Sequence, residues 1–256
     1  MNPFKQHLNP FRKIKRYLIY KLKKKINIDS INYLETSKID ELFKFFDSDK
    51  GTRWKKNQEI GHGYSQFYEK HLNVFKNEKI NILEIGSFAG ASAASFVKYF
   101  PSSKVYCLDI NLTNFKFFSK NIKVFGLDIS NELMINEFYK KINIFPESKF
   151  FDIIIDDGSH KLSDILKSLN SFFKNLKSGG IYILEDYKFP NYYSHLNDCS
   201  ENKIDEVIDF IKNKKVFKSE ILSSNTINNL IKQTDHIYQY KGLLENSDIS
   251  FLKKLN

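Results

Sequence analysis

The chain has 256 residues, of which 41% are hydrophobic and 15% aromatic, enough to bury one sizeable core. Its net charge is +10, but nine of the 40 Lys and Arg residues fall within residues 1–25, which contain no acid. Residues 26–256 carry 31 basic and 30 acidic side chains, and this near neutrality argues against a nucleic-acid-binding face on the main domain.

Cysteine content and hydropathy indicate the compartment. Cys107 and Cys199 are too few and too far apart for a disulfide framework or a zinc site, which fits a reducing environment. No apolar run reaches transmembrane length, and the N-terminus lacks the long apolar core of a secretory signal. We therefore expect a cytoplasmic protein.

The first predicted element is a basic amphipathic helix over residues 11–28. Phe11, Ile14, Leu18 and Leu22 recur at helical spacing, and cations occupy the other faces. Two interpretations stay open: the apolar stripe packs on the main domain, or it contacts an anionic membrane, where each nearby Lys or Arg contributes about 1 kcal/mol. A nucleic-acid-binding tail is a third. We divide the chain into this N-terminal helix, residues 1–30, and a main domain, residues 31–256.

From residue 80 onward, short apolar segments alternate with helical ones. Predicted strands cover residues 80–86, 104–110, 122–129, 151–157 and 181–186, and predicted helices cover residues 91–100, 131–141 and a segment that Ser163 caps and the sequence KSGG (177–180) ends. Strands that are apolar on both faces indicate a parallel sheet covered on both sides, a doubly wound α/β fold. A helix near residues 203–212 and a strand near residues 236–241 should complete the sheet with antiparallel strands.

Ligands of such sheets bind beyond the carboxyl ends of the strands. Gly86 and Gly90 follow the first strand in G-x-x-x-G spacing, which differs from the G-x-G-x-x-G of dinucleotide binders, and a tight strand-to-helix turn explains them equally well. Asp109 ends the second strand, where a carboxylate can accept both hydroxyls of a ribose. Asp128 follows the third strand and suits either an adenine edge or a helix cap. These positions fit NAD or S-adenosylmethionine (SAM).

Acidic pairs end the next two strands, Asp156–Asp157 and Glu185–Asp186. Neighbouring strands lie about 4.8 Å apart, so the four carboxylates converge if the strands are adjacent. Two unit charges 4 Å apart interact with about 4 kcal/mol at an effective dielectric constant of 20. A divalent cation would relieve this repulsion, and all-oxygen ligation favours Mg²⁺ or a similar ion, although capping of the following helices is an alternative for two of the acids. His160 suits a general base, because neutral histidine readily accepts a proton.

Four segments carry a resemblance to a known family. LEIGSFAGAS, YCLDI, FDIIIDDGSH and SGGIYILEDY resemble, in order and spacing, the motifs of class I SAM-dependent methyltransferases. Within that class the chain is similar to the Mg²⁺-dependent sugar O-methyltransferases of the macrocin and mycinamicin type, over roughly residues 47–242. The resemblance implies a Rossmann-like fold with a mostly parallel seven-stranded sheet. It implies SAM and Mg²⁺ as cofactors, with Asp157, Glu185 and Asp186 as metal ligands and His160 as the base.

The same resemblance implies residues for the two organic ligands. The segment from Ser48 to His71 resembles the D-K-G…H-x-Y…Y segment of this group, with a longer run between its two halves. The implied cofactor-binding residues are Lys50, Gly51, Glu84, Gly86, Ser87, Gly90, Ser92, Asp109, Asp128 and Asp156, and the implied acceptor-binding residues are His62, Tyr64 and Tyr187. For Asp156, orientation of the loop is an alternative to contact with SAM.

We therefore expect an O-methyltransferase that acts on a hydroxyl of a sugar in a surface glycan or its nucleotide- or lipid-linked precursor. The expected location is the cytoplasm, with peripheral membrane contact through residues 11–28, and enzymes of this group often form homo-oligomers. A catechol-like or polyketide hydroxyl is an alternative acceptor. An NAD(P)-dependent oxidoreductase shares Asp109 but requires another glycine spacing. A nucleic-acid methyltransferase would call for an N-P-P-Y-type motif after the fourth strand, and a membrane-associated binding module would not need the D-x-x-H and E-D patterns.

Overall fold

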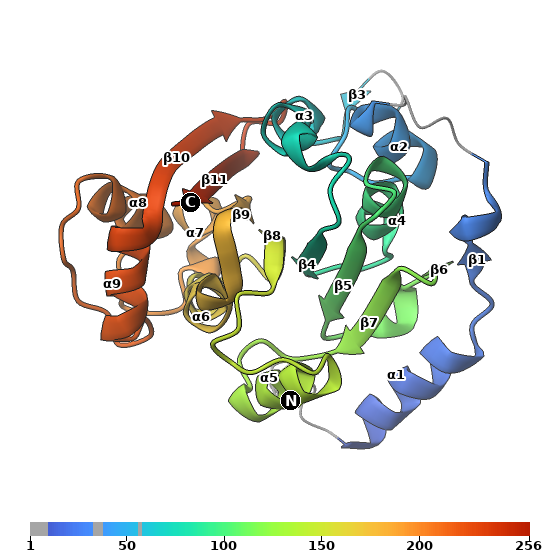
Figure 1. The fold of residues 1–256 in the computed structure, drawn as a ribbon, viewed down its shortest axis with the longest axis horizontal. Coiled ribbons are helices and arrows are strands. Elements are labelled where there is room, and N and C mark those ends of the chain that lie inside the picture. Colours follow the sequence, from blue (N-terminus) through green and yellow to red (C-terminus); the bar gives the residue numbers. More distant parts are fainter. Residues whose placement is uncertain (1–9, 33–37, 56–57) are drawn as a thin grey trace.

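A seven-stranded sheet organises the fold (Figure 1). Its order is β10 (Thr234–Lys241), β11 (Asp248–Lys254), β9 (Leu176–Glu185), β8 (Phe151–Asp156), β4 (Asn81–Ile85), β5 (Lys104–Asp109) and β7 (Ile122–Gly126). The strands from β9 to β7 are parallel, and β11 is antiparallel to both of its neighbours. This computed structural model describes residues 10–32, 38–55 and 58–256. The predicted doubly wound, mostly parallel seven-stranded sheet is confirmed.

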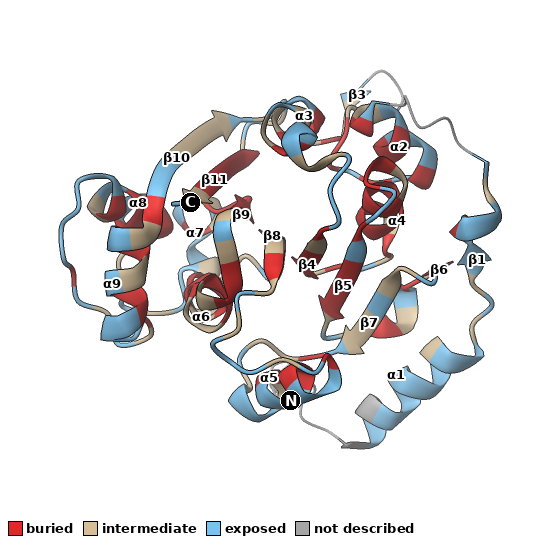
Figure 2. Ribbon diagram, viewed as in Figure 1, coloured by how far each residue is buried: buried red, intermediate tan, exposed pale blue. Residues whose placement is uncertain are grey.

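Helices cover both faces of the sheet and bury two separate cores. One face packs against α2 (Ile39–Phe46), α3 (Ser65–Leu72) and α4 (Ala91–Tyr99), and the other against α5 (Glu132–Lys141), α6 (Leu162–Phe172), α8 (Ile204–Lys212) and α9 (Ser224–Gln233). Side chains alternate across a strand, so Ile153 and Ile155 of β8 enter the first core and Ile154 enters the second. Figure 2 shows the buried strands between these layers. Cys107 is buried in the first core as a free thiol.

The N-terminal helix is shorter than predicted. Helix α1 covers Pro10–Leu22, because the chain then turns to pair β1 (Ile26–Asn27) with β6 (Phe117–Phe118). The predicted stripe faces solvent, with exposed fractions of 82% for Phe11, 57% for Ile14, 51% for Leu18 and 85% for Leu22. The interpretation that this stripe packs on the main domain is therefore wrong. Within the described ranges, no helix is long and apolar enough to cross a membrane.

Two other expectations for local structure are wrong. Helix α6 begins after Lys161, and Ser163 instead donates its backbone N–H and its hydroxyl to the Asp198 carboxylate. The KSGG segment belongs to β9, which starts at Leu176 and bulges before Ile181, where it pairs with Ile153. Gly179 lies in this bulge with φ of +70°, a backbone conformation that glycine adopts without strain.

The remaining short elements connect the layers. They are the strands β2 (Trp54–Lys55) and β3 (Gln58–Glu59), helix α7 (Phe189–Tyr192), and the 3₁₀ turns Ile28–Ser30, Asn73–Phe75, Leu112–Asn114, Phe173–Asn175 and Ser194–Leu196. Lys56 and Asn57, which belong to the motif-bearing segment 48–71, lie outside the described residues, as do residues 1–9 of the proposed N-terminal unit.

Asp40 at the start of α2 fixes the loop that carries Lys50. Its carboxylate accepts the backbone N–H of Thr52 (2.8 Å), the hydroxyls of Thr52 and Ser65 (2.7 Å each) and an ion pair from Lys44 (2.8 Å). Burial raises the pKa of this carboxyl group, but these donors outweigh burial and lower the pKa to about 2. Asp40→Asn should therefore lower the free energy of unfolding at pH 7 by about 2 kcal/mol, since a tenfold change in proton affinity corresponds to about 1.4 kcal/mol.

The direction of this pKa change also predicts a pH dependence. The pKa of Asp40 is lower in the folded chain than its ordinary value of 3.8, so its stabilisation is complete above about pH 4 and disappears as the pH falls towards 2. Urea unfolding curves of wild type and Asp40→Asn should converge over this range. The exposed neighbour Glu41 supplies the control, Glu41→Gln, which should stay within about 0.5 kcal/mol of wild type at pH 7. A constant difference from pH 7 to pH 2 would contradict the assignment.

Candidate active site

A cavity of about 540 Å³ lies beyond the carboxyl ends of the parallel strands. Gly86 follows β4, Asp109 ends β5, Asp128 follows β7 and Asp157 follows β8, and all four line the cavity. Lys50 enters from the loop after α2. This is the edge at which doubly wound sheets bind ligands.

The structure brings most, but not all, of the predicted cofactor residues to this cavity. Those that line it are Lys50, Gly86, Ser87, Ser92, Asp109 and Asp128. Those that are not part of its lining are Gly51, Glu84, Gly90 and Asp156. Gly90 instead precedes α4 with φ of +77°, and a side chain there would collide with the Phe115 ring. The binding roles of all ten stay predictions.

Gly86 allows the ends of two strands to meet. Its φ is +84°, and a Cβ atom added to it would lie 1.9 Å from the carbonyl oxygen of Asp157. The Asp157 N–H donates to the Ile85 carbonyl at 3.0 Å, so this close approach fixes the position of Asp157 at the edge of the cavity. Only glycine meets both demands.

We expect Gly86→Ala to destabilise the chain by about 3 kcal/mol or more, because both the backbone conformation and the contact with Asp157 must change. Gly126→Ala in β7 is the matched control, since its added Cβ would meet Leu112 at an ordinary 3.5 Å. That control should change stability by less than about 1 kcal/mol. Thermal unfolding of the two variants compares them directly, and equal effects would exclude a special constraint at Gly86.

Asp109 is already held in place by the backbone. One carboxylate oxygen accepts the N–H of Phe88 at 2.8 Å and the other accepts the N–H of Asn111 at 2.7 Å. Burial raises the pKa of this carboxyl group, and these hydrogen bonds oppose the shift. A carboxylate accepts more than one hydrogen bond per oxygen, so Asp109 keeps capacity for hydroxyl donors in the cavity.

Two buried acids stand behind the cavity. Glu84 accepts the Ser92 hydroxyl at Oε1, and Asp156 accepts the N–H of Gly158 at 3.2 Å. Among the described residues, the Oε2 of Glu84 and the Oδ2 of Asp156 have no hydrogen-bond partner. Burial raises the pKa of Asp156 to about 7, with Ser168 and Gly158 opposing it. Because Asp156 points away from the cavity, its contact with the turn is its observed role.

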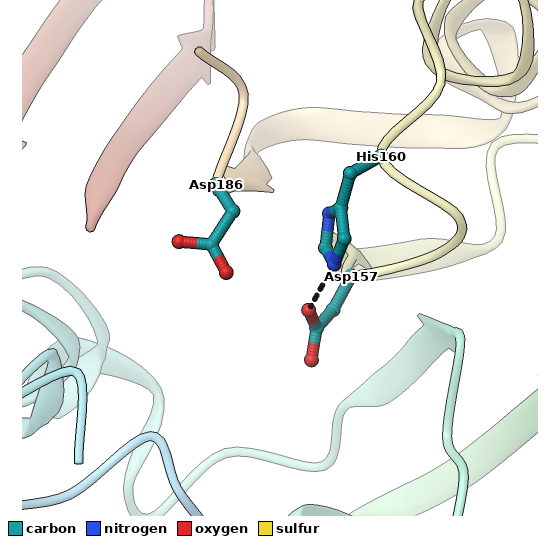
Figure 3. A group of neighbouring side chains, drawn as sticks. All are labelled: Asp157, His160 and Asp186. Carbon is teal, nitrogen blue, oxygen red and sulfur yellow. Dashed lines mark ion pairs between the residues drawn. The ribbon is translucent and has the colours of Figure 1, made fainter. Parts of the chain in front are cut away.

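Asp157, His160 and Asp186 form a compact group at the edge of the cavity (Figure 3). One potential ligand atom from each residue lies within 4.8 Å of the other two, and Nε2 of His160 is 3.7 Å from Oδ1 of Asp157. Asp157 and His160 follow β8, and Asp186 follows β9. These two strands are neighbours in the sheet. A metal ion could bind between these atoms, since carboxylate oxygens and imidazole nitrogens are both ligand types.

Glu185 lies outside this group because Lys50 intervenes. The Lys50 ammonium lies 2.5 Å from Oδ2 of Asp157 and 2.7 Å from Oε2 of Glu185, and the Tyr68 hydroxyl donates to Oε1 of Glu185. Burial lowers the pKa of Lys50, but the two carboxylates outweigh burial and raise it well above its usual value. Burial also raises the pKa of Glu185, and the positive charge of Lys50 opposes this increase. Lys50 and Glu185 therefore form an ionised pair, because two carboxylates contact the one ammonium group.

The prediction that four carboxylates converge and repel one another is therefore wrong in two respects. Asp156 faces the second core, on the side of the sheet that α5 and α6 cover. Lys50 compensates the charges of Asp157 and Glu185 within the protein. A divalent cation is not required to relieve the repulsion. The case for a metal ion depends instead on the geometry of Asp157, His160 and Asp186.

Asp186 is held from its other side by the predicted acceptor residues. The Tyr64 hydroxyl donates to Oδ1 of Asp186 at 2.5 Å, and Nδ1 of His62 lies 3.4 Å from the same oxygen. Burial lowers the pKa of His62, but Asp186 and other nearby acids outweigh burial and raise it to about 9. Nδ1 of His62 also lies 2.7 Å from the Ser247 hydroxyl. Tyr187 is not part of this arrangement: it is 1% exposed, and Gln239 donates to its hydroxyl within the opposite core.

Sequence reasoning missed two residues of this network. Tyr68 is the last tyrosine of the H-x-Y…Y pattern in the motif-bearing segment, but no role followed from the motif alone. Ser247 lies in a loop after β10 and carries no local signal. The N–H of Leu243 donates to the His62 carbonyl at 2.8 Å and brings this loop to the His62 backbone, and the N–H of Gly242 donates to the Ser247 carbonyl at 2.7 Å.

Comparison with known proteins identifies the family. The methyltransferase domain family matches residues 83–187. L-olivosyl-oleandolide 3-O-methyltransferase of Streptomyces antibioticus is 30% identical over 168 residues, 62% of this chain and 39% of the relative. Ribosomal RNA small subunit methyltransferase G of Malacoplasma penetrans is 30% identical over 208 residues, 76% of this chain and 81% of the relative.

A solved structure shows the same fold. The MycE methyltransferase of the mycinamycin biosynthetic pathway, in complex with Mg and SAH, aligns with a TM-score of 0.63 at 20% identity. The alignment covers 86% of this chain and 55% of that chain, and the chain spans about two fifths of the length of the oleandolide methyltransferase. Sequence and fold agree that the chain belongs to the S-adenosylmethionine-dependent methyltransferases.

Proposed function

We propose that this protein is a Mg²⁺-dependent O-methyltransferase that moves the methyl group of SAM to a hydroxyl group of a sugar. One observation carries the proposal: Asp157 lines the cavity and also belongs to the group that could hold a metal ion. Cofactor and metal would thus meet at a single carboxylate. The similarity to a protein named as a sugar O-methyltransferase supports the choice of acceptor.

The cavity fits the cofactor in both shape and donor chemistry. The missing side chain of Gly86 lets backbone line the cavity, and Asp109 offers carboxylate oxygens to ribose hydroxyls. Asp128 supplies a further acceptor beyond β7, at the place expected for the adenine edge. Ser87 and Ser92 add hydroxyl groups from the turn and from the first turn of α4.

The group at the cavity edge fits a divalent cation. Asp157 and Asp186 would hold it through carboxylate oxygens, while Lys50 and Tyr64 fix the orientation of these two side chains. Bound there, Mg²⁺ would supply positive charge that stabilises the developing negative charge on the acceptor oxygen. Glu185 as a third ligand stays a prediction, because Lys50 and Tyr68 occupy its carboxylate.

His160 is the proposed general base. Nε2 of His160 is directed towards Asp157 (Figure 3), and its ring packs against Phe189 at 4.9 Å between centroids. A hydroxyl seated between His160 and the cavity would lose its proton to Nε2 as its oxygen bonds to the methyl carbon. The bond between that carbon and the sulfur of SAM breaks in the same step, so the charges balance.

We further propose that the acceptor is a sugar of a surface glycan or of its nucleotide- or lipid-linked precursor, modified in the cytoplasm at the membrane surface. His62 and Tyr64 are the proposed acceptor-side residues, and Tyr187 would act through packing because it is buried. Self-association also belongs to this proposal. A catechol-like or polyketide hydroxyl would use the same chemistry and is the alternative acceptor.

A second candidate function is methylation of ribosomal RNA, which the name of the Malacoplasma relative suggests. A group of two acids and a histidine suits a hydroxyl acceptor, so among the groups of RNA it would suit a ribose hydroxyl rather than a ring nitrogen of a base. The near neutrality of residues 26–256 argues against RNA as substrate.

Two measurements test the proposal in order. Calorimetric titration should give saturable micromolar binding of SAM and none of NAD⁺. Transfer of radiolabelled methyl from SAM should then occur, with Mg²⁺, to a nucleotide-linked or lipid-linked sugar, and not to catechol or ribosomal RNA. Absence of SAM binding would overturn the whole proposal. Transfer to RNA, or to catechol alone, would keep the reaction class and overturn the acceptor.

A further inference from the structure

Helix α1 presents a continuous apolar stripe to solvent. Phe11, Ile14, Leu18 and Leu22 are each more than half exposed and follow one another at i, i+3, i+7 and i+11, which places them on one face of a helix. Figure 2 shows α1 as an almost entirely exposed element at the edge of the molecule. Four large apolar side chains gathered on one face differ from the single exposed apolar residues found on any surface.

At least two contacts attach this part of the chain to the main domain from positions outside the stripe. Tyr20 packs edge-on against Phe115 with 6.3 Å between ring centroids. Just beyond the helix, the Lys23 ammonium donates to the carbonyls of Thr113 (3.0 Å) and Asn114 (3.1 Å). At 100° per residue, Tyr20 lies opposite the stripe. The fold thus orients the stripe outward.

The charge of the helix is of one sign. PFRKIKRYLIYKL contains five Lys or Arg residues and no acid. Lys15 and Lys21 are exposed and border the stripe, one on each side, by the same helical geometry. Long cationic side chains at the border of an apolar face can place their charged ends at lipid phosphates while their methylene groups stay with the apolar face.

We propose that α1 is an interfacial helix that binds the surface of an anionic lipid bilayer. The stripe would enter the boundary between head groups and acyl chains, and the flanking lysines would meet lipid phosphates. A second copy of the chain docked face to face would bring five cations against five. RNA would satisfy the cations but leave the four apolar side chains in water.

This inference goes beyond methyl transfer and does not depend on it. The inner side of α1, including Arg16 and Tyr20, lines a second cavity of about 460 Å³ that shares Leu127 and Asp128 with the cofactor cavity. Membrane contact through the outer side leaves these inner residues in place. It would hold the cofactor cavity close to lipid-linked acceptors.

Flotation of the full chain with vesicles tests the proposal. Vesicles that contain phosphatidylglycerol should carry the protein, and pure phosphatidylcholine vesicles should carry far less. The double variant Leu18→Asp, Leu22→Asp should lower the partition coefficient at least about tenfold, because two anchoring side chains become anionic. Lys15→Gln with Lys21→Gln should lower binding to the anionic vesicles by a similar factor and leave the weak binding to phosphatidylcholine unchanged.

The matched control is Val74→Asp with Val216→Asp, two exposed apolar residues outside α1 with exposed fractions of 73% and 76%. This control should float like wild type. Thermal unfolding and SAM titration of every variant verify the fold. Absence of SAM binding by wild type would overturn the proposed function and leave the membrane proposal intact. Failure of wild type to float, equal flotation of the Leu18, Leu22 variant, or binding to an RNA oligonucleotide in preference to vesicles would overturn the membrane proposal.

Discussion

Asp157→Asn should lower kcat/KM for Mg²⁺-supported methyl transfer by at least about 10³. Loss of this carboxylate removes a proposed metal ligand from the group with His160 and Asp186 and deprives the buried ammonium of Lys50 of one of its two partners. Loss of one such preorganised charge in an active site costs about 10²–10³ in rate on its own, and weaker metal binding adds to that loss. EDTA treatment of wild type should reduce the activity to a similar level.

A direct measurement of metal binding makes this prediction specific. Binding of Mn²⁺, followed by electron paramagnetic resonance, should weaken at least about tenfold in Asp157→Asn. Asp152→Asn is the matched control, because Asp152 lies on the same strand at its other end and pairs with Lys177. That control should keep its Mn²⁺ affinity and its kcat/KM within about twofold. Full activity of Asp157→Asn, or of wild type in EDTA, would exclude the proposed metal chemistry.

The sheet could be predicted because its signal is local. The parallel strands β4, β5, β8 and β9 are buried on both faces over most of their length, so each appears in the sequence as a short apolar run between helical segments, whereas β7 at the edge is only partly buried. The strand β11 was not located, although its core residues Ile249, Phe251 and Leu252 are buried, because the last 20 residues alternate weakly between apolar and polar positions. The start of β9 was missed because glycines predicted a break where the chain forms a bulge.

The candidate site could be predicted as far as it depends on strand ends. Asp157, His160 and Asp186 come together because β8 and β9 are neighbours in the sheet. The position of Lys50 could not be read in the same way, since 107 residues separate it from Asp157 and 135 from Glu185. The strand alternation that turns Asp156 to the opposite core was available in the sequence, because adjacent residues of a strand point to opposite faces.

The outward face of α1 illustrates a different limit. Helical spacing identified its stripe, but amphipathicity alone does not say whether an apolar face meets the protein or another surface. That choice is made by tertiary contacts, here Tyr20 on Phe115 and Lys23 on the turn that follows β5. Charge of one sign around the stripe was the only local indication of the observed orientation.

The second large effect is expected at His160, and its backbone decides which variant to make. His160 has φ of +57°, a left-handed conformation that asparagine tolerates better than most residues with a side chain. His160→Asn should lower kcat by about 10²–10⁴, the usual contribution of a general base. Because the proposed ligands are carboxylates, Mn²⁺ affinity should stay within about threefold of wild type. His195→Asn, at an exposed histidine in a 3₁₀ turn, should change neither quantity.

The two measurements together separate the base from a ligand. A fall in kcat with intact metal binding assigns the proton transfer to His160, in keeping with its ring lying beside Asp157 and against Phe189. A parallel loss of Mn²⁺ binding would instead make His160 a metal ligand. The geometry permits this role, because one atom each of His160, Asp157 and Asp186 lie within 4.8 Å of one another. Unchanged kcat would contradict both roles. Another acceptor would then have to take the proton. Because Lys50 and His62 already contact carboxylates, water would be the remaining acceptor.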